Sequence, residues 1–571
     1  MDDLINIAKG DRPADLLLQG ARIVNVFTGE IYPANIAIAG GWIAGVGEYY
    51  TEGREILDLK GFFLVPGLIN GHLHLESSLL SPAEYARLAL PRGTTTVVLD
   101  PHEIANVLGI PGIHALISAS RDLPLDFFFM APSCVPATPL ETAGASLLAK
   151  DVEKLLSDPA VLGLGEMMNF PGVLKKDPEI WRKIQTARKT QKPLDGHAPL
   201  LSGMSLNAYI ASGIESDHEG TRQEEAQEKL RLGMWLMIRE GSAAKNLEDL
   251  LPAVTPQNSR RCLFVLDDLE PADLLKRGEM DHLLRKSVYM GLNPITAIQM
   301  ATLNPAERFG FKDRGAIAPG RRADIVAIAD LKEFRPLLVI KNGKVTAREG
   351  KAYPFRTGDW DEKILRTVKI KPLNDSSFDL PLNGEKAWAI GLVPDQILTR
   401  KLAVLVRKDS RGVVLSDPGS DILKIAVVER HRASGRIGLG LVKRMGLKRG
   451  AVATSVAHDS HNIIVTGVND LDMKIAVQEI ERMQGGFVVV EKGKILADLP
   501  LPVAGLMSLQ PAETVAAGME RLNQAAHEIG ATLQDPFITL SFLALPVIPE
   551  LRITDQGLVD VSEFRTIPLN P

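Results

Sequence analysis

Apolar and polar residues alternate along positions 15–66, and glycines separate the alternating segments. Alternation of this kind is typical of strands with one buried face, and glycine is typical of the turns between them. The same pattern returns far downstream, at 323–328 and 338–345. We therefore predict one small β-sandwich domain, formed by 1–66 together with 311–360 and interrupted by a large insertion.

The insertion, 67–310, alternates short apolar runs with helical patterns, which favours a parallel β/α architecture. The candidate strands are a run ending at His74 and then 95–100, 127–131, 161–166, 193–197, 213–217, 236–239 and 263–267. Eight β/α units in about 240 residues predict a (β/α)8 TIM-like barrel, whose active site lies at the carboxyl ends of the strands. The remaining region, 361–571, has apolar strands and helices of its own and predicts a C-terminal α/β or α+β domain.

Composition agrees with a globular protein of two or three domains. A chain of 571 residues is too long for one compact core, and 45% hydrophobic with 24% charged residues is typical of a soluble protein. The net charge of -5 argues against a nucleic-acid partner. Two cysteines, Cys134 and Cys262, cannot form a disulfide framework, and neither a signal peptide nor a membrane-spanning apolar run is evident. We expect a cytoplasmic protein without membrane contact.

Two histidines, His72 and His74, end the first candidate barrel strand at spacing i, i+2. Residues at this spacing share one face of a strand, so both imidazoles can converge on a single cation. A pair of histidines alone is weak evidence, and for any one histidine a structural role is the better interpretation.

Other ionisable residues follow the same rule of position. Glu166 ends the fourth candidate strand, His197 the fifth and Asp267 the eighth, and His218 follows the sixth. All would face one mouth of the barrel. Imidazoles and carboxylates in these numbers can hold two divalent metal ions with a carboxylate bridging them and a hydroxide between.

The chain resembles the amidohydrolase superfamily and, over nearly its whole length, the adenine deaminase family within it. The resemblance rests on the strand-end pattern and on five motifs. These are Gly-His-Leu-His-Leu-Glu-Ser-Ser at 71–78, Gly-Thr-Thr-Thr at 93–96, Asp-Pro-His-Glu-Ile-Ala-Asn-Val at 100–107, Gly-Glu-Met-Met-Asn-Phe-Pro-Gly at 165–172 and Ala-His-Asp-Ser-His-Asn at 457–462.

The resemblance implies hydrolytic removal of the 6-amino group of adenine, giving hypoxanthine and ammonia, by a hydroxide at a binuclear metal centre. It implies manganese first, with iron or zinc as alternatives, and a homodimer acting in purine salvage or catabolism. The implied metal ligands are His72, His74, Glu166, His197, His218 and Asp267. Glu166 would bridge the metals or pass a proton toward ring N1, and Asp267 would take the proton of the attacking water and deliver it to the leaving amine.

Two further groups have open roles. Asp100, His102 and Glu103 would complete the metal shell or the proton network, or would form a capped turn that enters the next helix. His458 and His461 would close the barrel mouth or contact the substrate, or would form a hydrogen-bonded turn.

One departure from the family pattern bears on the substrate. After the two aspartates at 267 and 268 the family usually continues with a basic residue and then His before Pro, whereas this chain has Leu269 and Glu270. An acceptor-only group replaces an imidazole there and changes the charge near the substrate. We therefore keep three alternatives: deamination of a related heterocycle, hydrolysis of a cyclic amide or N-acyl bond, and an inactive purine-binding homologue. Zinc deaminases that act on nucleic acid are excluded, because no Cys-x-x-Cys occurs.

Overall fold

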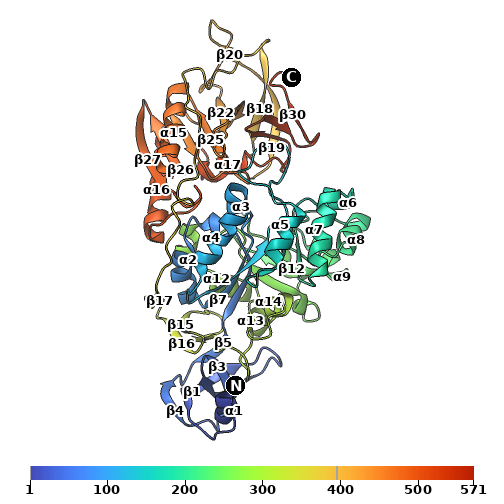
Figure 1. Cartoon of the computed structure of the whole chain (residues 1–571), viewed down its shortest axis with the longest axis vertical. Helices are drawn as coiled ribbons and strands as arrows, with labels where there is room; N and C mark the ends of the chain where they lie inside the picture. Colours follow the sequence, from blue (N-terminus) through green and yellow to red (C-terminus); the bar gives the residue numbers. More distant parts are fainter. Residues whose placement is uncertain (1, 243, 394–395) are drawn as a thin grey trace.

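The computed structural model describes residues 2–242, 244–393 and 396–571. The molecule is elongated, with the N-terminal sheet at one end, a barrel in the middle and the C-terminal region at the other end (Figure 1). Chain order and spatial order differ in one respect, because the chain leaves the N-terminal sheet, builds the barrel and returns to that sheet before it enters the C-terminal region.

The N-terminal sheet contains nine strands from two distant stretches of the chain. They are β1 (Ala14–Val24), β2 (Ile31–Ala39), β3 (Trp42–Val46), β4 (Gly53–Asp58), β5 (Phe63–Pro66), β14 (Ile325–Ile328), β15 (Pro336–Lys341), β16 (Lys344–Arg348) and β17 (Lys351–Ala352). The two stretches meet where β5 pairs antiparallel with β14. Helix α1 (Asp2–Ala8) packs against β2 and β3.

Eight parallel strands follow in the order of the chain, which confirms the predicted barrel class. They are β6 (Leu68–Leu73), β7 (Thr94–Leu99), β8 (Asp126–Ala131), β9 (Val161–Met167), β10 (Leu194–Gly196), β11 (Ser216–Asp217), β12 (Trp235–Arg239) and β13 (Cys262–Val265). Strand β7 is buried over its whole length, as expected for a parallel sheet covered on both faces.

The apolar run that ends at His74 forms two strands rather than one. Strand β5 belongs to the N-terminal sheet and β6 to the barrel, and Gly67 separates them. A Cβ atom at Gly67 would lie 2.2 Å from Thr95 Oγ1, so only glycine permits the close approach to β7 at this point.

Backbone hydrogen bonds close the barrel at two seams. The Glu215 N–H donates to the Leu194 carbonyl between β10 and β11. At the other seam the Asp267 N–H donates to the His72 carbonyl and the His74 N–H donates to the Asp267 carbonyl, which joins the first strand to the end of the eighth. Three candidate ligands are thereby tied together through the main chain.

Helices cover the outside of the barrel (Figure 1). They are α2 (Pro82–Ala89), α3 (His102–Leu108), α4 (Ile110–Ser120), α5 (Ala149–Leu156), α6 (Phe170–Leu174), α7 (Pro178–Lys189), α8 (Gly203–Ala211), α9 (Gln223–Arg231), α10 (Leu247–Leu250), α11 (Pro271–Lys276), α12 (Met280–Tyr289), α13 (Pro294–Met300) and α14 (Leu303–Arg308). Helix α7 shows how the sequence sets a helix start: the Asp177 carboxylate accepts from the N–H groups of Glu179 and Ile180, and Pro178 occupies the first turn.

The C-terminal region is built on an eight-stranded, mostly antiparallel sheet with helices against it. Its sheet strands are β18 (Lys386–Leu392), β19 (Thr399–Leu405), β22 (Ile422–Val428), β23 (Ile437–Lys443), β24 (Ala451–Thr454), β25 (Ile463–Gly467), β26 (Gly486–Glu491) and β27 (Lys494–Pro500). Its helices are α15 (Asp470–Met483), α16 (Ala512–Glu528) and α17 (Pro536–Phe542). Smaller hairpins are formed by β20 (Arg407–Lys408) with β21 (Val414–Leu415), and by β28 (Leu551–Thr554), β29 (Gly557–Asp560) and β30 (Arg565–Ile567).

The barrel and the C-terminal region share one apolar core. The Ser508 N–H donates to the Leu79 carbonyl at 2.7 Å, and α11 packs against α16. The carboxyl-terminal mouth of the barrel is therefore covered by C-terminal side chains. Among the described residues, none of the helices combines the length and apolarity needed to cross a bilayer.

Candidate metal centre at the barrel mouth

Six side chains named from the sequence converge at the carboxyl ends of the barrel strands. They are His72 in β6 and His74 just after it, Glu166 in β9, His197 after β10, His218 after β11 and Asp267 after β13. Five are buried, and the His197 side chain keeps 24% of its surface exposed. The arrangement follows from the barrel, because every parallel strand ends at the same mouth.

Glu166 lies at the centre of this group. Its Oε1 is 3.2 Å from His74 Nε2 and 3.3 Å from His102 Nδ1. Its Oε2 is 2.6 Å from His197 Nδ1 and 3.2 Å from His218 Nε2. Burial alone would raise the pKa of Glu166, but these imidazoles hold its pKa well below the ordinary value. An ionised carboxylate with two imidazoles at each oxygen has donors suited to a divalent cation on either side.

Asp267 is the second carboxylate of the group. Its Oδ1 lies 3.3 Å from His72 Nε2 and 3.1 Å from His74 Nε2, and its Oδ2 lies 2.5 Å from Arg239 Nη1. Burial would raise the pKa of Asp267, but the Arg239 guanidinium and the two imidazoles hold it well below its ordinary value. The backbone here has φ +60°, a left-handed conformation that aspartate adopts more readily than most residues.

Asp100 orients two members of the group rather than joining them. Its carbonyl accepts a hydrogen bond from His74 Nδ1 at 2.9 Å, so Nε2 is the His74 nitrogen that faces the carboxylates. Its Oδ2 accepts from the Glu166 N–H at 2.8 Å. Helix α3 does begin at His102, but the side chain that accepts from an N–H of its first turn, that of Ile104, is Glu76 and not Asp100. The sequence-based alternative of a capped turn is therefore wrong for the Asp100 side chain.

Divalent cations fit the donors present. His72 Nε2 and His102 Nδ1 are buried without a hydrogen-bond partner in the described part of the chain, although buried polar atoms normally have one. The sets His72–His74–Asp267, His72–Glu166–His218 and His74–His102–Glu166 each bring three ligand atoms within 4.8 Å of one another. Mixed imidazole and carboxylate donors suit manganese, iron and zinc.

Sequence reasoning missed Glu219 and Arg239. Arg239 Nη1 lies 2.5 Å from Glu219 Oε1 as well as from Asp267, and Glu219 forms a further three-ligand set with His197 and His218. The guanidinium thus links the loop after β11 to the loop after β13. Arg239 ends a predicted strand, so the rule that found the ligands could have found it, had cationic residues been included.

A second buried cluster joins the barrel to the C-terminal region. Glu103 of α3 places Oε1 2.9 Å from His458 Nδ1 and Oε2 3.6 Å from His461 Nε2. Burial would lower the pKa of His458, but the adjacent Glu103 carboxylate raises it to about 9. Burial would likewise raise the pKa of Glu103, and the two imidazoles lower it below its ordinary value. Glu103 thus contacts the C-terminal loop and not the six-residue group.

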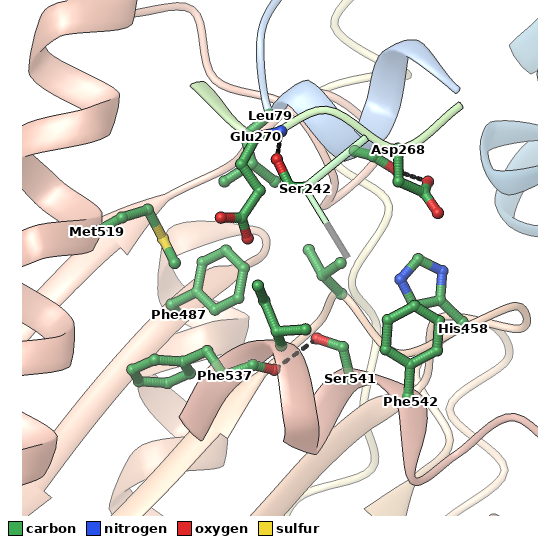
Figure 2. Close-up of a pocket in the computed structure, with 13 residues that line it drawn as sticks. Leu79, Ser242, Asp268, Glu270, His458, Phe487, Met519, Phe537, Ser541 and Phe542 are labelled. Carbon is green, nitrogen blue, oxygen red and sulfur yellow. Dashed lines mark hydrogen bonds between the residues drawn. The ribbon is translucent and has the colours of Figure 1, made fainter. Parts of the chain in front are cut away.

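A pocket lies beside the metal centre, between the barrel mouth and the C-terminal region (Figure 2). Its lining comprises Ser77, Leu79, Ser242, Asp268 and Glu270 from the barrel and Val456, His458, Phe487, Met519, Phe537, Ile538, Ser541 and Phe542 from the C-terminal region. Asp268 directly follows the candidate ligand Asp267. Ser77 Oγ donates a hydrogen bond to Asp268 Oδ1 at 2.5 Å.

The unusual pair after the aspartates divides between core and pocket. Leu269 is 3% exposed and belongs to the apolar core, whereas the Glu270 carboxyl extends toward Phe487 and Met519 in the pocket (Figure 2). Burial, followed by the negative charges of Asp535 and Asp273, raises the pKa of Glu270 to about 8. Of these two residues, Glu270 is therefore the one that lines the pocket.

Comparison with known proteins shows the family to which the chain belongs. Residues 63–346 match the Amidohydrolase family, and residues 396–565 match the Adenine deaminase C-terminal domain. An adenine deaminase of Dehalococcoides mccartyi is 50% identical over 100% of this chain and 99% of its own length. One of Desulfatibacillum aliphaticivorans has the same identity and coverage, and adenine deaminase 2 of Carboxydothermus hydrogenoformans is 48% identical, again over 100% and 99%.

The chain is a hydrolase of the amidohydrolase superfamily and belongs to the adenine deaminase family within it. The resemblance found in the sequence motifs is thereby confirmed. The superfamily is metal-dependent, in agreement with the imidazole and carboxylate groups at the barrel mouth.

Proposed function

We propose that this protein hydrolyses adenine to hypoxanthine and ammonia. The observation that carries the proposal is identity of 48–50% with adenine deaminases over the full length of both chains, C-terminal region included. The convergence of two carboxylates and the histidines around Glu166 supports it, because hydrolysis of a C–N bond in an aromatic ring needs an activated water.

The residues at the barrel mouth have complementary roles in this proposal. Two divalent cations, Mn²⁺ first and Fe²⁺ or Zn²⁺ as alternatives, supply water that is deprotonated near neutral pH when they are bound there. They would be held by His72, His74, Glu166, His197, His218 and Asp267. Asp267 would accept the proton of the attacking water and pass it to the leaving amine, and Glu166 would help to hold the cations or pass a proton toward ring N1.

Surrounding residues keep these groups in position. The Asp100 carbonyl accepts from His74 Nδ1 and so orients that ring. Arg239 forms ion pairs with both Asp267 and Glu219 and favours the ionised form of Asp267. His102 is the candidate for an additional ligand, because its Nδ1 faces Glu166 without a hydrogen-bond partner in the described chain. Each role is a separate hypothesis that a single substitution can test.

We propose that the chain has the three domains predicted from its sequence. Residues 1–66 with 311–360 form the small β domain, 67–310 the hydrolase barrel, and 361–571 the C-terminal adenine deaminase-type domain. We propose a cytoplasmic homodimer that acts on a small-molecule purine base in purine metabolism and has no nucleic-acid or membrane partner.

The decisive experiment is ammonia release from a panel of aminopurines and aminopyrimidines by manganese-loaded protein. We expect adenine to have the highest kcat/KM. Preference for another amino-heterocycle would support the alternative motivated by Glu270, and hydrolysis of cyclic amides instead would indicate a different reaction on the same barrel. Tight purine binding without ammonia release at about two equivalents of metal would refute catalysis.

A further inference from the structure

His458 brings a C-terminal side chain to the pocket beside the metal centre. It follows β24, in the loop that leads to β25, and is the one imidazole among the described residues that line the pocket. In Figure 2 its ring lies between the Phe542 ring and the Asp268 carboxyl group. A side chain of the C-terminal region therefore faces the same space as barrel residues adjacent to Asp267.

One main-chain contact holds the His458 backbone, and two side-chain contacts fix the orientation of its ring. The His458 N–H donates to the Ser541 carbonyl at 3.1 Å, and the ring stacks on Phe542 with centroids 4.6 Å apart and planes at 22°. Nδ1 lies 2.9 Å from Glu103 Oε1. The second ring nitrogen, Nε2, makes no hydrogen bond within the described residues. A ring held this firmly has one free polar atom to offer a ligand.

The Glu103–His458–His461 cluster is better suited to orient His458 than to bind a cation. The Ala457 N–H donates to His461 Nδ1 at 3.2 Å, so the hydrogen of a neutral His461 ring lies on Nε2, which faces Glu103 Oε2. A nitrogen that carries a hydrogen cannot ligate a metal. Glu103 is thus an acceptor between two imidazoles. Its carboxylate raises the pKa of His458 to about 9, and in the protonated ring Nδ1 donates to Glu103 while Nε2 is a second donor.

The pocket has the chemistry of a site for a planar amino-heterocycle. Phe487, Phe537 and Phe542 supply aromatic faces, and Asp268 and Glu270 supply oxygens on the barrel side. Ring nitrogens of a purine accept hydrogen bonds and its N–H groups donate them, so a donor opposite carboxyl groups complements both.

We propose that His458 contacts the substrate, donating a hydrogen bond from Nε2 to N3 or N7 of the purine, and that Glu103 is its positioning residue. This inference rests on the proposed function. It makes the C-terminal region part of the active site, so that selection among heterocycles depends on both regions.

The test compares His458→Ala with the wild type on adenine, 3-deazaadenine and 7-deazaadenine. We expect His458→Ala to lower kcat/KM for adenine about 10- to 100-fold, the effect of losing a hydrogen bond to a charged donor. The wild type should discriminate against one deaza analogue by a similar factor, and His458→Ala should use that analogue and adenine equally. His527→Ala is the matched control, because this histidine lies in the same region with an exposed side chain.

Glu103→Gln tests the positioning role. We expect a smaller loss of kcat/KM in this variant, and the double variant with His458→Ala should be no worse than His458→Ala alone, because Glu103 acts through that ring. Additive losses would contradict this role. Metal content and urea midpoint, measured on every variant, separate loss of a contact from loss of folding.

The outcomes distinguish the two proposals. If the wild type releases no ammonia from adenine, the proposed function fails and this inference fails with it. If the wild type is active and His458→Ala has unchanged kcat/KM, or loses it equally on all three compounds, only the inference is overturned.

Discussion

The candidate metal centre and the pocket beside it shift the pKa of buried carboxyl groups in opposite directions. At the centre, Glu166 is surrounded by imidazoles that keep it ionised against the cost of burial. In the pocket, Glu270 faces aromatic side chains and other acids, and its pKa rises to about 8. The environment alone decides whether a glutamate is an anionic ligand or a neutral acid at pH 7.

The contrast follows from the side chains that surround each carboxyl group. A hydrolytic centre needs fixed negative charge to hold cations and accept protons, whereas the pocket combines the Glu270 carboxyl, whose pKa is raised, with the His458 imidazole. Asp267 and Asp268 mark the boundary, because the first contacts the histidines and the second lines the pocket. Substitutions on either side of that boundary test the centre and the pocket separately.

The largest effect is expected from Asp267→Asn. The amide cannot accept the proton of the attacking water, so ammonia release should fall roughly 10³-fold or more. Steady-state kinetics with metal analysis of the same sample checks this prediction. Asn retains the shape, and a variant with normal activity would remove Asp267 from the mechanism. Chelation of the wild type, followed by recovery with Mn²⁺, provides the reference for metal loss.

Arg239→Met should destabilise the centre without altering the pocket. The substitution removes the guanidinium that pairs with Asp267 and Glu219. Removing one partner of a buried ion pair costs about 3–5 kcal/mol of folding free energy. The free energy of unfolding in urea, measured on metal-free protein, checks this value. Arg260→Met is the control, because that side chain is exposed. Equal stability of the two variants would contradict the role given to Arg239.

The barrel could be predicted from the sequence because its signals are local. Each strand is a short apolar run, and each candidate ligand lies at the end of its run, so the topology of a parallel barrel brings distant residues to one mouth. The lengths were less predictable. β11 contains only Ser216–Asp217, because β12 pairs with those two residues alone, where the sequence favoured 213–217.

Contacts between the barrel and the C-terminal region could not be predicted in this way. Glu103 lies on the first turn of a helix and His458 in a loop far along the chain, and no periodicity links them. The motifs around both residues resemble the family, but that resemblance does not predict a contact between Glu103 and His458. Tertiary packing of the barrel against the C-terminal region decides that contact. Leu269 shows the same limit, because its burial in the core is visible only in the structure.

Glu270→Gln tests the pocket side of the comparison through pH. The pKa of Glu270 is about 8 in the folded protein and near 4.3 when unfolded, so between these values the folded state keeps a proton that the unfolded state has lost. Stability should therefore fall as pH rises from 5 to 8, by roughly 1 kcal/mol more in the wild type than in Glu270→Gln after allowance for partial exposure. Urea unfolding across this range measures the difference.

The control is Glu224→Gln, an exposed glutamate of α9. It should leave the pH dependence of the wild type unchanged. Parallel curves for wild type and Glu270→Gln would show that Glu270 is ionised throughout, and the contrast between pocket and centre would then disappear.

Ser77→Ala should give the smallest effect, at the boundary between the two regions. The variant removes the hydrogen bond from Ser77 Oγ to Asp268 Oδ1, whose net contribution is about 1 kcal/mol. Because Asp268 lines the pocket and is absent from the three metal-ligand sets that hold Asp267 or Glu166, KM for adenine should rise a few-fold while metal content stays unchanged. Ser118→Ala, an exposed serine of α4, is the control. Loss of metal in Ser77→Ala would mean that Asp268 supports the centre through Asp267, and the boundary between the centre and the pocket would then lie beyond Asp268.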